Sequence, residues 1–178
     1  MLQVAVAAYS GPPPPEAVMA AHSLVEALAS RCGQVTILLG GYRGLMRVVA
    51  DAALDRGLRV VFVIPQRYEA DEYPESSVVI RTGLDVRERS SILVRSGDAL
   101  VVLGGGLGTL FEAFIACSYG IPVYYLRVGT DFVTDRFAEC FRDGVIDSRV
   151  GCRFSYFSAP ADLVEALCNR GGAVHVQR

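Results

Sequence analysis

Lysine is missing from this chain, and all 17 of its basic residues are arginine. This absence excludes mechanisms that need a lysine amine, namely a pyridoxal Schiff base, an aldolase imine or the phosphate-binding lysine of a P-loop. Tryptophan is absent as well, and the only histidines are His22 and His175. With so few histidines, neither a histidine-centred active site nor a multi-histidine metal site is expected. We therefore expect no bound metal and no cofactor.

The chain also lacks an excess of basic charge and lacks long apolar runs. Its net charge is −2 and no basic stripe is visible, so we expect no nucleic-acid partner. The apolar runs fall short of the roughly 18 residues that cross a membrane, and no secretory signal pattern is present. With 52% hydrophobic and 20% charged residues, the 178-residue chain is not disordered. We expect one cytoplasmic domain over residues 1–178, with no membrane association.

Cysteine is present but scattered, without a CxxC pair. An odd count of five and wide spacing argue against a disulfide framework or a zinc site. The sequence favours free buried thiols, with a single bridge as the alternative. The five positions are Cys32, Cys117, Cys140, Cys152 and Cys168.

Short apolar runs alternate with helical patterns along the whole chain. Val60–Ile64 and Ala99–Leu103 are apolar at consecutive positions, which is typical of parallel strands buried on both faces. This alternation predicts an α/β fold: a single-domain, doubly wound, Rossmann-like parallel sheet of about seven strands flanked by helices. The predicted strands are Gln3–Ala8, Val35–Leu39, Arg59–Ile64, Val78–Arg81, Ala99–Leu103, Val123–Arg127 and, more weakly, Arg153–Phe157. The predicted helices are Glu16–Arg31, Gly44–Arg56, Val86–Ser96, Leu110–Tyr119, Asp131–Arg142 and Ala161–Asn169.

Glycine-rich or polar turns follow three of these strands, at the edge of the sheet where such folds bind ligands. They are Tyr9–Gly11, Gly40–Met46 and Gly104–Thr109. In the last turn, glycines let backbone N–H groups approach an anion, and the following helix adds unpaired donors and partial positive charge. This turn predicts a phosphate site that needs no lysine; the alternative is that its glycines only permit a tight turn. Neither the P-loop pattern nor the GxGxxG dinucleotide fingerprint matches.

Two charged residues near that edge each allow two interpretations. Thr109 and Glu112 spell a capping box, yet Glu112 would also lie one turn from a bound phosphate, close enough to a ribose to act as acid or base. Arg89 follows a second capping box, Asp85–Glu88. It is either a solvated surface residue or a partner of the ligand. An arginine beside Glu112 would favour the ionised carboxylate.

Taken together and in order, these segments resemble the LOG (lonely guy) family of Rossmann-like proteins, often labelled possible lysine decarboxylases. Family members carry GGGxxGLM, MxxRK and PGGxGTxxE segments, and the corresponding stretches here are Gly40–Met46, Val86–Ser90 and Gly104–Glu112. The resemblance implies a nucleotide-binding α/β fold that is usually dimeric. It also implies phosphoribohydrolase activity, in which a nucleoside 5′-monophosphate loses its base and leaves ribose 5-phosphate.

Carried over residue by residue, the resemblance assigns a catalytic pair and a nucleotide site. Arg89 and Glu112 would be catalytic, with Glu112 stabilising a cationic ribose or activating water and Arg89 assisting electrostatically. Phosphate would lie on Gly105, Gly106, Gly108 and Thr109, and the nucleotide site would also include Ser10, Gly11, Gly40, Gly41 and Gly44.

The chain departs from the family pattern in all three segments. The first segment differs in the spacing of one glycine-rich position, and in the second Val86 and Ser90 stand where the motif has methionine and lysine. In the third, Gly104 stands where the motif has proline, and Phe111 where the enzymes commonly have a second glutamate. These departures resemble a divergent branch close to molybdenum-cofactor-carrier-like members. Two functions therefore stay open: a phosphoribohydrolase acting on AMP-like nucleotides, and a non-catalytic carrier or sensor of a nucleotide or molybdopterin-type ligand. A pyridoxal-dependent decarboxylase is excluded, because the chain has no lysine.

Two further expectations concern the surroundings of the site. The stretch Pro65–Ser77 is expected to form a loop over it that selects the base. The family resemblance implies a homodimer, and the predicted helices Gly44–Arg56 and Val86–Ser96 offer apolar residues to either the sheet or a partner. Those residues are Val48, Val49, Ile92 and Leu93.

Overall fold

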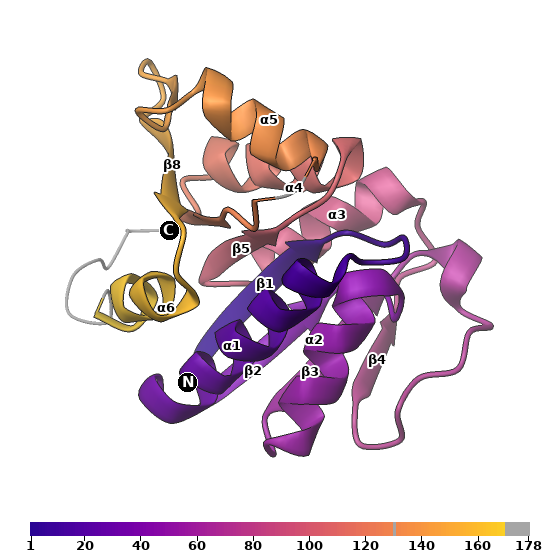
Figure 1. Cartoon of the computed structure of the whole chain (residues 1–178). Helices are drawn as coiled ribbons and strands as arrows, with labels where there is room; N and C mark the ends of the chain where they lie inside the picture. The colour runs from indigo at the N-terminus through magenta and orange to yellow at the C-terminus, as the bar shows by residue number, and fades with distance from the viewer. Residues whose placement is uncertain (130, 170–178) are drawn as a thin grey trace.

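The computed structural model describes residues 1–129 and 131–169, which fold into one eight-stranded sheet with helices on both faces (Figure 1). The order across the sheet is β4-β3-β2-β1-β5-β6-β8-β7. The strands are β1 (Leu2–Ala8), β2 (Val35–Leu39), β3 (Arg59–Ile64), β4 (Val78–Arg81), β5 (Ala99–Leu103), β6 (Val123–Leu126), β7 (Val145–Asp147) and β8 (Cys152–Phe157). The helices are α1 (Pro15–Arg31), α2 (Gly44–Asp55), α3 (Val86–Arg95), α4 (Leu107–Ser118), α5 (Val133–Cys140) and α6 (Pro160–Cys168), with a short 3₁₀ helix, η1, at Gln66–Tyr68.

The predicted doubly wound parallel sheet is confirmed, with one strand more than expected. The additional strand, β7, is three residues long and pairs antiparallel with β8 at the edge of the sheet. Every other neighbouring pair of strands is parallel. A strand this short carries too few residues for a periodic pattern, so the local sequence holds no signal for it.

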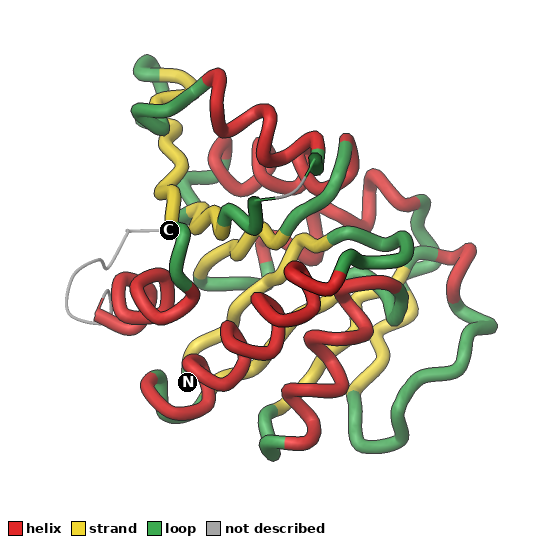
Figure 2. The backbone as a smooth tube through the Cα atoms, in the orientation of Figure 1, coloured by secondary structure: helices red, strands yellow, loops and turns green. Residues whose placement is uncertain are grey.

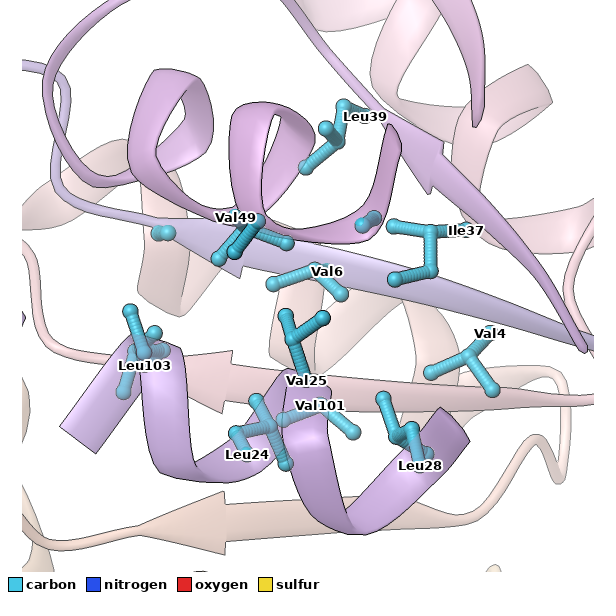
Figure 3. Packing of buried hydrophobic residues seen from close by; sticks show 14 of the residues in the cluster. Val4, Val6, Leu24, Val25, Leu28, Ile37, Leu39, Val49, Val101 and Leu103 are labelled. Carbon is cyan, nitrogen blue, oxygen red and sulfur yellow. The ribbon is translucent and has the colours of Figure 1, made fainter. Parts of the chain in front are cut away.

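Two apolar layers cover the sheet, one on each face. On the first, α1 and α2 pack against side chains such as Val4, Val6 and Leu103 (Figure 3), and α6 belongs to the same apolar cluster. On the second, α3, α4 and α5 cover side chains such as Leu100 and Val102. Burial on both faces explains why the central strands are apolar at consecutive positions. It also separates the helices into two groups, and α3 and α4, which carry Arg89 and Glu112, belong to the same group.

The order of the strands reverses between β1 and β5. From β1 the chain builds outward through β2, β3 and β4, and it then returns to the other side of β1 to form β5. Ala8 is level with Leu103 in the register of these two parallel strands. The turns that follow β1 and β5 therefore leave the sheet side by side, at the position where α/β folds bind ligands.

The interpretation of the cysteines as free thiols is wrong for four of the five. Cys32 at the end of α1 is bridged to Cys168 at the end of α6, and Cys117 on α4 is bridged to Cys152 on β8. Cys140 is free and exposed. The pairs are 136 and 35 residues apart in sequence, so spacing could not reveal them. The first of these bridges attaches the last helix of the described chain to the first helix.

Two smaller observations complete the fold. In residues 1–129 and 131–169, none of the helices has the length and apolar character needed to cross a membrane. The sequence prediction involving His175 concerns a position outside the described residues.

Candidate functional site

Three turns at the carboxyl ends of β1, β2 and β5 form the floor of the candidate site. Gly44, the first residue of α2, has a φ of +54°, and a Cβ there would lie 2.5 Å from the carbonyl oxygens of Tyr9 and Gly11. The next amide, that of Leu45, donates to Tyr9 O at 2.8 Å. The turn after β1, with the exposed Ser10, is thus held against the first turn of α2.

The glycine turn after β5 leads directly into α4. Gly105 has a φ of +138°, and any side chain on it would overlap the Thr109 hydroxyl, so this position requires glycine. Gly106 and Gly108 have no atom within 4 Å of where a Cβ would stand, so they face open space. Within the described chain, the Thr109 hydroxyl has no hydrogen-bond partner. The turn therefore leaves open space beside Gly106 and Gly108, while the Thr109 hydroxyl lies against Gly105.

The capping-box interpretation of Thr109 and Glu112 is wrong. Helix α4 begins at Leu107 with Gly106 as its N-cap, three residues earlier than predicted, and no side chain caps it. Glycine at positions 106 and 108 does not delay the helix, although glycine is a poor helix former. Thr109 is consequently the third helical residue. The first-turn amides of α4 remain without a side-chain acceptor, which is the arrangement that binds an anion.

Arg89 and Glu112 meet between α3 and α4. Arg89 Nη1 lies 3.3 Å from Glu112 Oε1, and the two side chains are only 6% and 12% exposed. The capping box at the start of α3 is confirmed: Asp85 accepts from the amides of Arg87 and Glu88, and the Glu88 side chain accepts from the amide of Asp85. This cap fixes the start of α3, and with it the direction in which Arg89 points. The interpretation of Arg89 as a solvated residue is wrong.

Gly40 is the third partner in this arrangement. A Cβ on Gly40 would overlap the guanidinium of Arg89, whereas a Cβ on Gly41 would only touch the Tyr68 ring at 3.9 Å. The arginine side chain therefore lies flat against the backbone where β2 ends. The first glycine after β2 is needed for the close approach of Arg89, which the sequence pattern could not reveal.

Ser90 is a site residue that the sequence analysis treated only as a lost lysine. Its hydroxyl lies 3.0 Å from Glu112 Oε1, so Arg89 and Ser90 donate to the same oxygen. Among the described residues nothing donates to Glu112 Oε2. The sequence feature that could have identified Ser90 as a site residue is its position directly after Arg89. The carboxylate is held by one oxygen, and its other oxygen is free to contact a ligand or water.

Burial raises the pKa of the Glu112 carboxyl above its usual value of 4.5, and Arg89 and Ser90 offset part of that rise. Arg89 favours the ionised carboxylate, as expected, but removal from water outweighs the attraction of this one cation, so the net shift of the Glu112 pKa is upward. A carboxyl group whose protonated form is favoured by burial in this way can serve as a general acid or base.

The stretch Pro65–Ser77 contains η1 and otherwise runs as a loop between β3 and β4 (Figure 2). An ion pair of 2.7 Å joins Asp71 to Arg43, the residue before α2, and the Arg43 guanidinium stacks over the Tyr68 ring at 4.5 Å. These contacts hold the stretch beside Gly41 and the turn after β2. Sequence reasoning placed the loop here but did not identify the contacts that attach it.

A large cavity adjoins the other side of the glycine turn. It has a volume of about 1180 Å³ and lies at the carboxyl ends of β1 and β6. Its wall includes the Tyr9 and Phe132 rings, which pack 4.9 Å apart, and Phe132 also fills the space beside Gly104. Apart from the turn after β1, no part of this region was predicted as a site, although the segment after β6 follows a strand end. The lining residues are Tyr9, Pro12, Pro14, Glu16, Arg127, Val128, Gly129, Asp131, Phe132, Asp135, Glu139 and Ser158.

The outer surface of α4 is apolar next to the Arg89–Glu112 pair. Leu107 is 82% exposed, Phe111 40% and Phe114 39%, and Ile92 on α3 is also exposed. Of the residues considered for a dimer contact, Val49 and Leu93 are buried against the sheet. In residues 1–129 and 131–169, no group of three or more His, Cys, Asp or Glu side chains is placed to hold a metal ion.

Known proteins resemble this chain in sequence and in fold. A rice (Oryza sativa subsp. japonica) protein named as a probable cytokinin riboside 5′-monophosphate phosphoribohydrolase is 34% identical over 150 residues, which is 79% of this chain and 66% of that protein. The chain thus spans slightly less than two thirds of this relative. An X-ray structure of a structural-genomics target matches 94% of this chain and 98% of its own, with 31% identity and a TM-score of 0.83.

The molybdenum cofactor carrier protein of Chlamydomonas reinhardtii has the same fold, with a TM-score of 0.77 and 23% identity over 97% of this chain and 99% of that one. The SLOG cluster4 family model matches residues 1–147, which include all three glycine-containing turns and both members of the buried ion pair. This LOG-like chain belongs to the SLOG cluster4 family.

Proposed function

We propose that the protein is a phosphoribohydrolase that cleaves the N-glycosidic bond of a nucleoside 5′-monophosphate. The observation that carries the proposal is the buried Arg89–Glu112 pair, 3.3 Å apart, beside a glycine turn whose helix has no side-chain cap. The pair supplies a carboxyl group for the ribose, and the turn supplies donors for the phosphate.

The 5′-phosphate binds at the first turn of α4. The backbone amides there have no acceptor within the helix, and the helix dipole favours negative charge. Gly106 and Gly108 leave room for the anion, and the Thr109 hydroxyl has no internal partner to lose. Phosphate binding at this position fixes the ribose one helical turn along α4, toward Glu112.

Glu112 acts on the ribose through its free oxygen, Oε2. As the bond from C1′ to the base breaks, the base takes the bonding electrons and the ribose ring becomes cationic. Glu112 stabilises this cation and accepts a proton from the water that attacks C1′. That proton passes to the departing base, so the products are the free base and ribose 5-phosphate. Arg89 keeps the Glu112 carboxyl group in place while that carboxyl group gains and loses a proton.

Release of free adenine from AMP by the purified protein tests this proposal. Glu112→Gln should abolish release while AMP still binds, because the group is used in the transition state more than in binding. Glu88→Gln is the matched control, since glutamine also completes a capping box. Loss of activity in both variants, or release that survives in Glu112→Gln, would contradict the assigned role of Glu112.

The second candidate function is carriage of a larger ligand, such as a molybdopterin-type compound, without chemistry. It is favoured by the cavity of about 1180 Å³, which exceeds the roughly 300–1,000 Å³ of most small-molecule pockets. The fold shared with a protein named as a molybdenum cofactor carrier adds to this candidate. Tight binding of AMP, GMP, CMP or UMP without release of base would select carriage over hydrolysis.

A further inference from the structure

One hydroxyl group in the site has two acceptors and a single proton. Ser90 Oγ lies 3.0 Å from Glu112 Oε1 and 2.9 Å from the carbonyl oxygen of Val86, one turn earlier on α3. A serine hydroxyl donates one hydrogen bond, so it points to one of these acceptors at a time. Ser90 is only 3% exposed, so water does not supply an alternative partner.

The charge of Glu112 decides whether the Ser90 hydroxyl donates to Glu112 or to the Val86 carbonyl oxygen. An ionised carboxylate forms a charge-assisted hydrogen bond that is stronger than a bond to a neutral carbonyl. A protonated carboxyl group can itself donate to the Ser90 oxygen, and the Ser90 proton is then free to turn to Val86. That carbonyl has two lone pairs, so it can accept the hydroxyl in addition to its helical partner.

We infer that Ser90 is a two-state positioning residue, which donates to Glu112 when the carboxyl group is ionised and to the Val86 carbonyl when it is protonated. The inference rests on the proposed function in one respect: the two states of Ser90 would let Glu112 gain and lose a proton during turnover. A hydroxyl with an acceptor on each side keeps a hydrogen bond in both states. Neither charge state therefore leaves the buried Ser90 hydroxyl unpaired.

Few charged groups surround the Glu112 carboxyl group, so the hydrogen bond from Ser90 has a measurable effect on its pKa. Arg89 is the one charged group of the described chain that acts on Glu112, and Tyr68 and Tyr73, from the segment after β3, act on Arg89 in turn. With a single cation opposing burial, the pKa of Glu112 responds to one hydrogen bond from Ser90.

The test is a pH titration of two carbon-13 labels in the full protein, one on the Glu112 carboxyl carbon and one on the Val86 carbonyl carbon. In the wild type both signals should change with the same midpoint. In Ser90→Ala the Val86 signal should stop following the titration. The Glu112 midpoint should then rise by about one pH unit, because a hydrogen bond to the charged form has been removed. Ser90→Thr, which keeps the hydroxyl, should restore both behaviours.

Ser96→Ala is the matched control, because Ser96 also donates to the carbonyl one turn earlier, at 2.8 Å, but lies at the other end of α3. It should leave both titrations unchanged. A Val86 signal that stays flat while Glu112 titrates in the wild type would overturn the inference, and this reading needs no variant to fold. An unchanged Glu112 midpoint in folded Ser90→Ala would overturn it as well. Neither measurement requires substrate, so a failure of AMP hydrolysis would reject the proposed function without affecting this result.

Discussion

The Arg89 guanidinium occupies the space in which any side chain on Gly40 would begin. Two segments that are distant in sequence, the end of β2 and the middle of α3, thereby fix each other. Arg89 cannot move toward the sheet, and on its other side it donates to Glu112 at 3.3 Å. The ion pair is thus positioned by a glycine that carries no functional group of its own.

Gly40→Ala should displace Arg89 and separate it from Glu112. We expect a loss of stability of about 1–3 kcal/mol, as for other overpacked sites. The rate of base release should fall by about 100-fold through misplacement of the pair. Gly41→Ala is the control for stability, because the nearest atom, in the Tyr68 ring, is 3.9 Å away. Chemical denaturation and an adenine-release assay measure the two effects of Gly40→Ala, and an equal loss of stability in both variants would contradict this role of Gly40.

Thr109→Val should weaken phosphate binding while leaving the fold intact, because the Thr109 hydroxyl has no partner in the described chain. The rise in melting temperature produced by AMP or ribose 5-phosphate measures this effect, since ligands that favour the folded state stabilise it. Thr134→Val is the control: its buried hydroxyl also lacks a partner in the described part of the chain. That variant should keep the ligand shift and gain about 1 kcal/mol of stability. If neither ligand shifts the wild-type melt, the phosphate site is wrong.

Stability should depend on pH through Glu112 in a predictable direction. Burial raises the pKa of Glu112 above 4.5, so the folded state holds this proton more tightly than the unfolded state. The free energy of unfolding of the wild type, relative to Glu112→Gln, should therefore fall as pH rises from about 4.5 to the folded-state pKa, and level off above it. Denaturant titrations at several pH values measure this difference.

The pH dependence of stability through Asp85 should have the opposite sign to that through Glu112. Hydrogen bonds from the amides of Glu88 and Arg87 hold the pKa of Asp85 below its usual value of 3.8. Its contribution to stability should be complete above that value and be lost as pH falls through the lowered pKa. Relative to Asp85→Asn, the wild type should thus lose stability on acidification. Curves of the same sign for Asp85 and Glu112 would refute the assigned environments.

Reducing agents should lower the melting temperature. The bridge between Cys32 and Cys168 spans 136 residues, and closing a loop of this length stabilises a protein by about 4–5 kcal/mol in the chain-entropy model. Cys168→Ser should reproduce much of the effect of the reductant, whereas Cys140→Ser should leave the melt unchanged, since Cys140 is free. Alkylation followed by mass spectrometry counts the thiols directly. Five reactive thiols in the unfolded, unreduced protein would exclude both bridges.

We expect a homodimer formed through the outer surface of α4 and α3, because large apolar side chains are exposed there beside the site. Phe111→Asp should yield monomers, as burial of this ring would be lost. Val78→Asp, an exposed position on the edge strand β4, is the control. Light scattering at micromolar concentration gives the mass, and a wild-type value near 19 kDa would reject the dimer.

Features that reside in consecutive residues could be predicted from the sequence, and features that depend on contacts between distant segments could not. The apolar run Ala99–Leu103 and the glycines after it indicated a buried strand and a turn, because both properties reside in consecutive residues. The start of α4 was misplaced because glycine at positions 106 and 108 is a weak local helix former. Contacts of the folded chain, including that between Gly105 and Thr109, override this preference.

The sequence by itself determined the α/β class, the parallel central strands and the three turns at their carboxyl ends, since period, composition and glycine position are local. Tertiary structure alone decided that Arg89 is buried rather than solvated, that Gly40 makes room for it and that Ser90 shares Glu112 with it. It also decided which cysteines meet. The physical reason is that burial, pKa and pairing depend on neighbours brought together from different elements, and no single stretch of sequence records those distances.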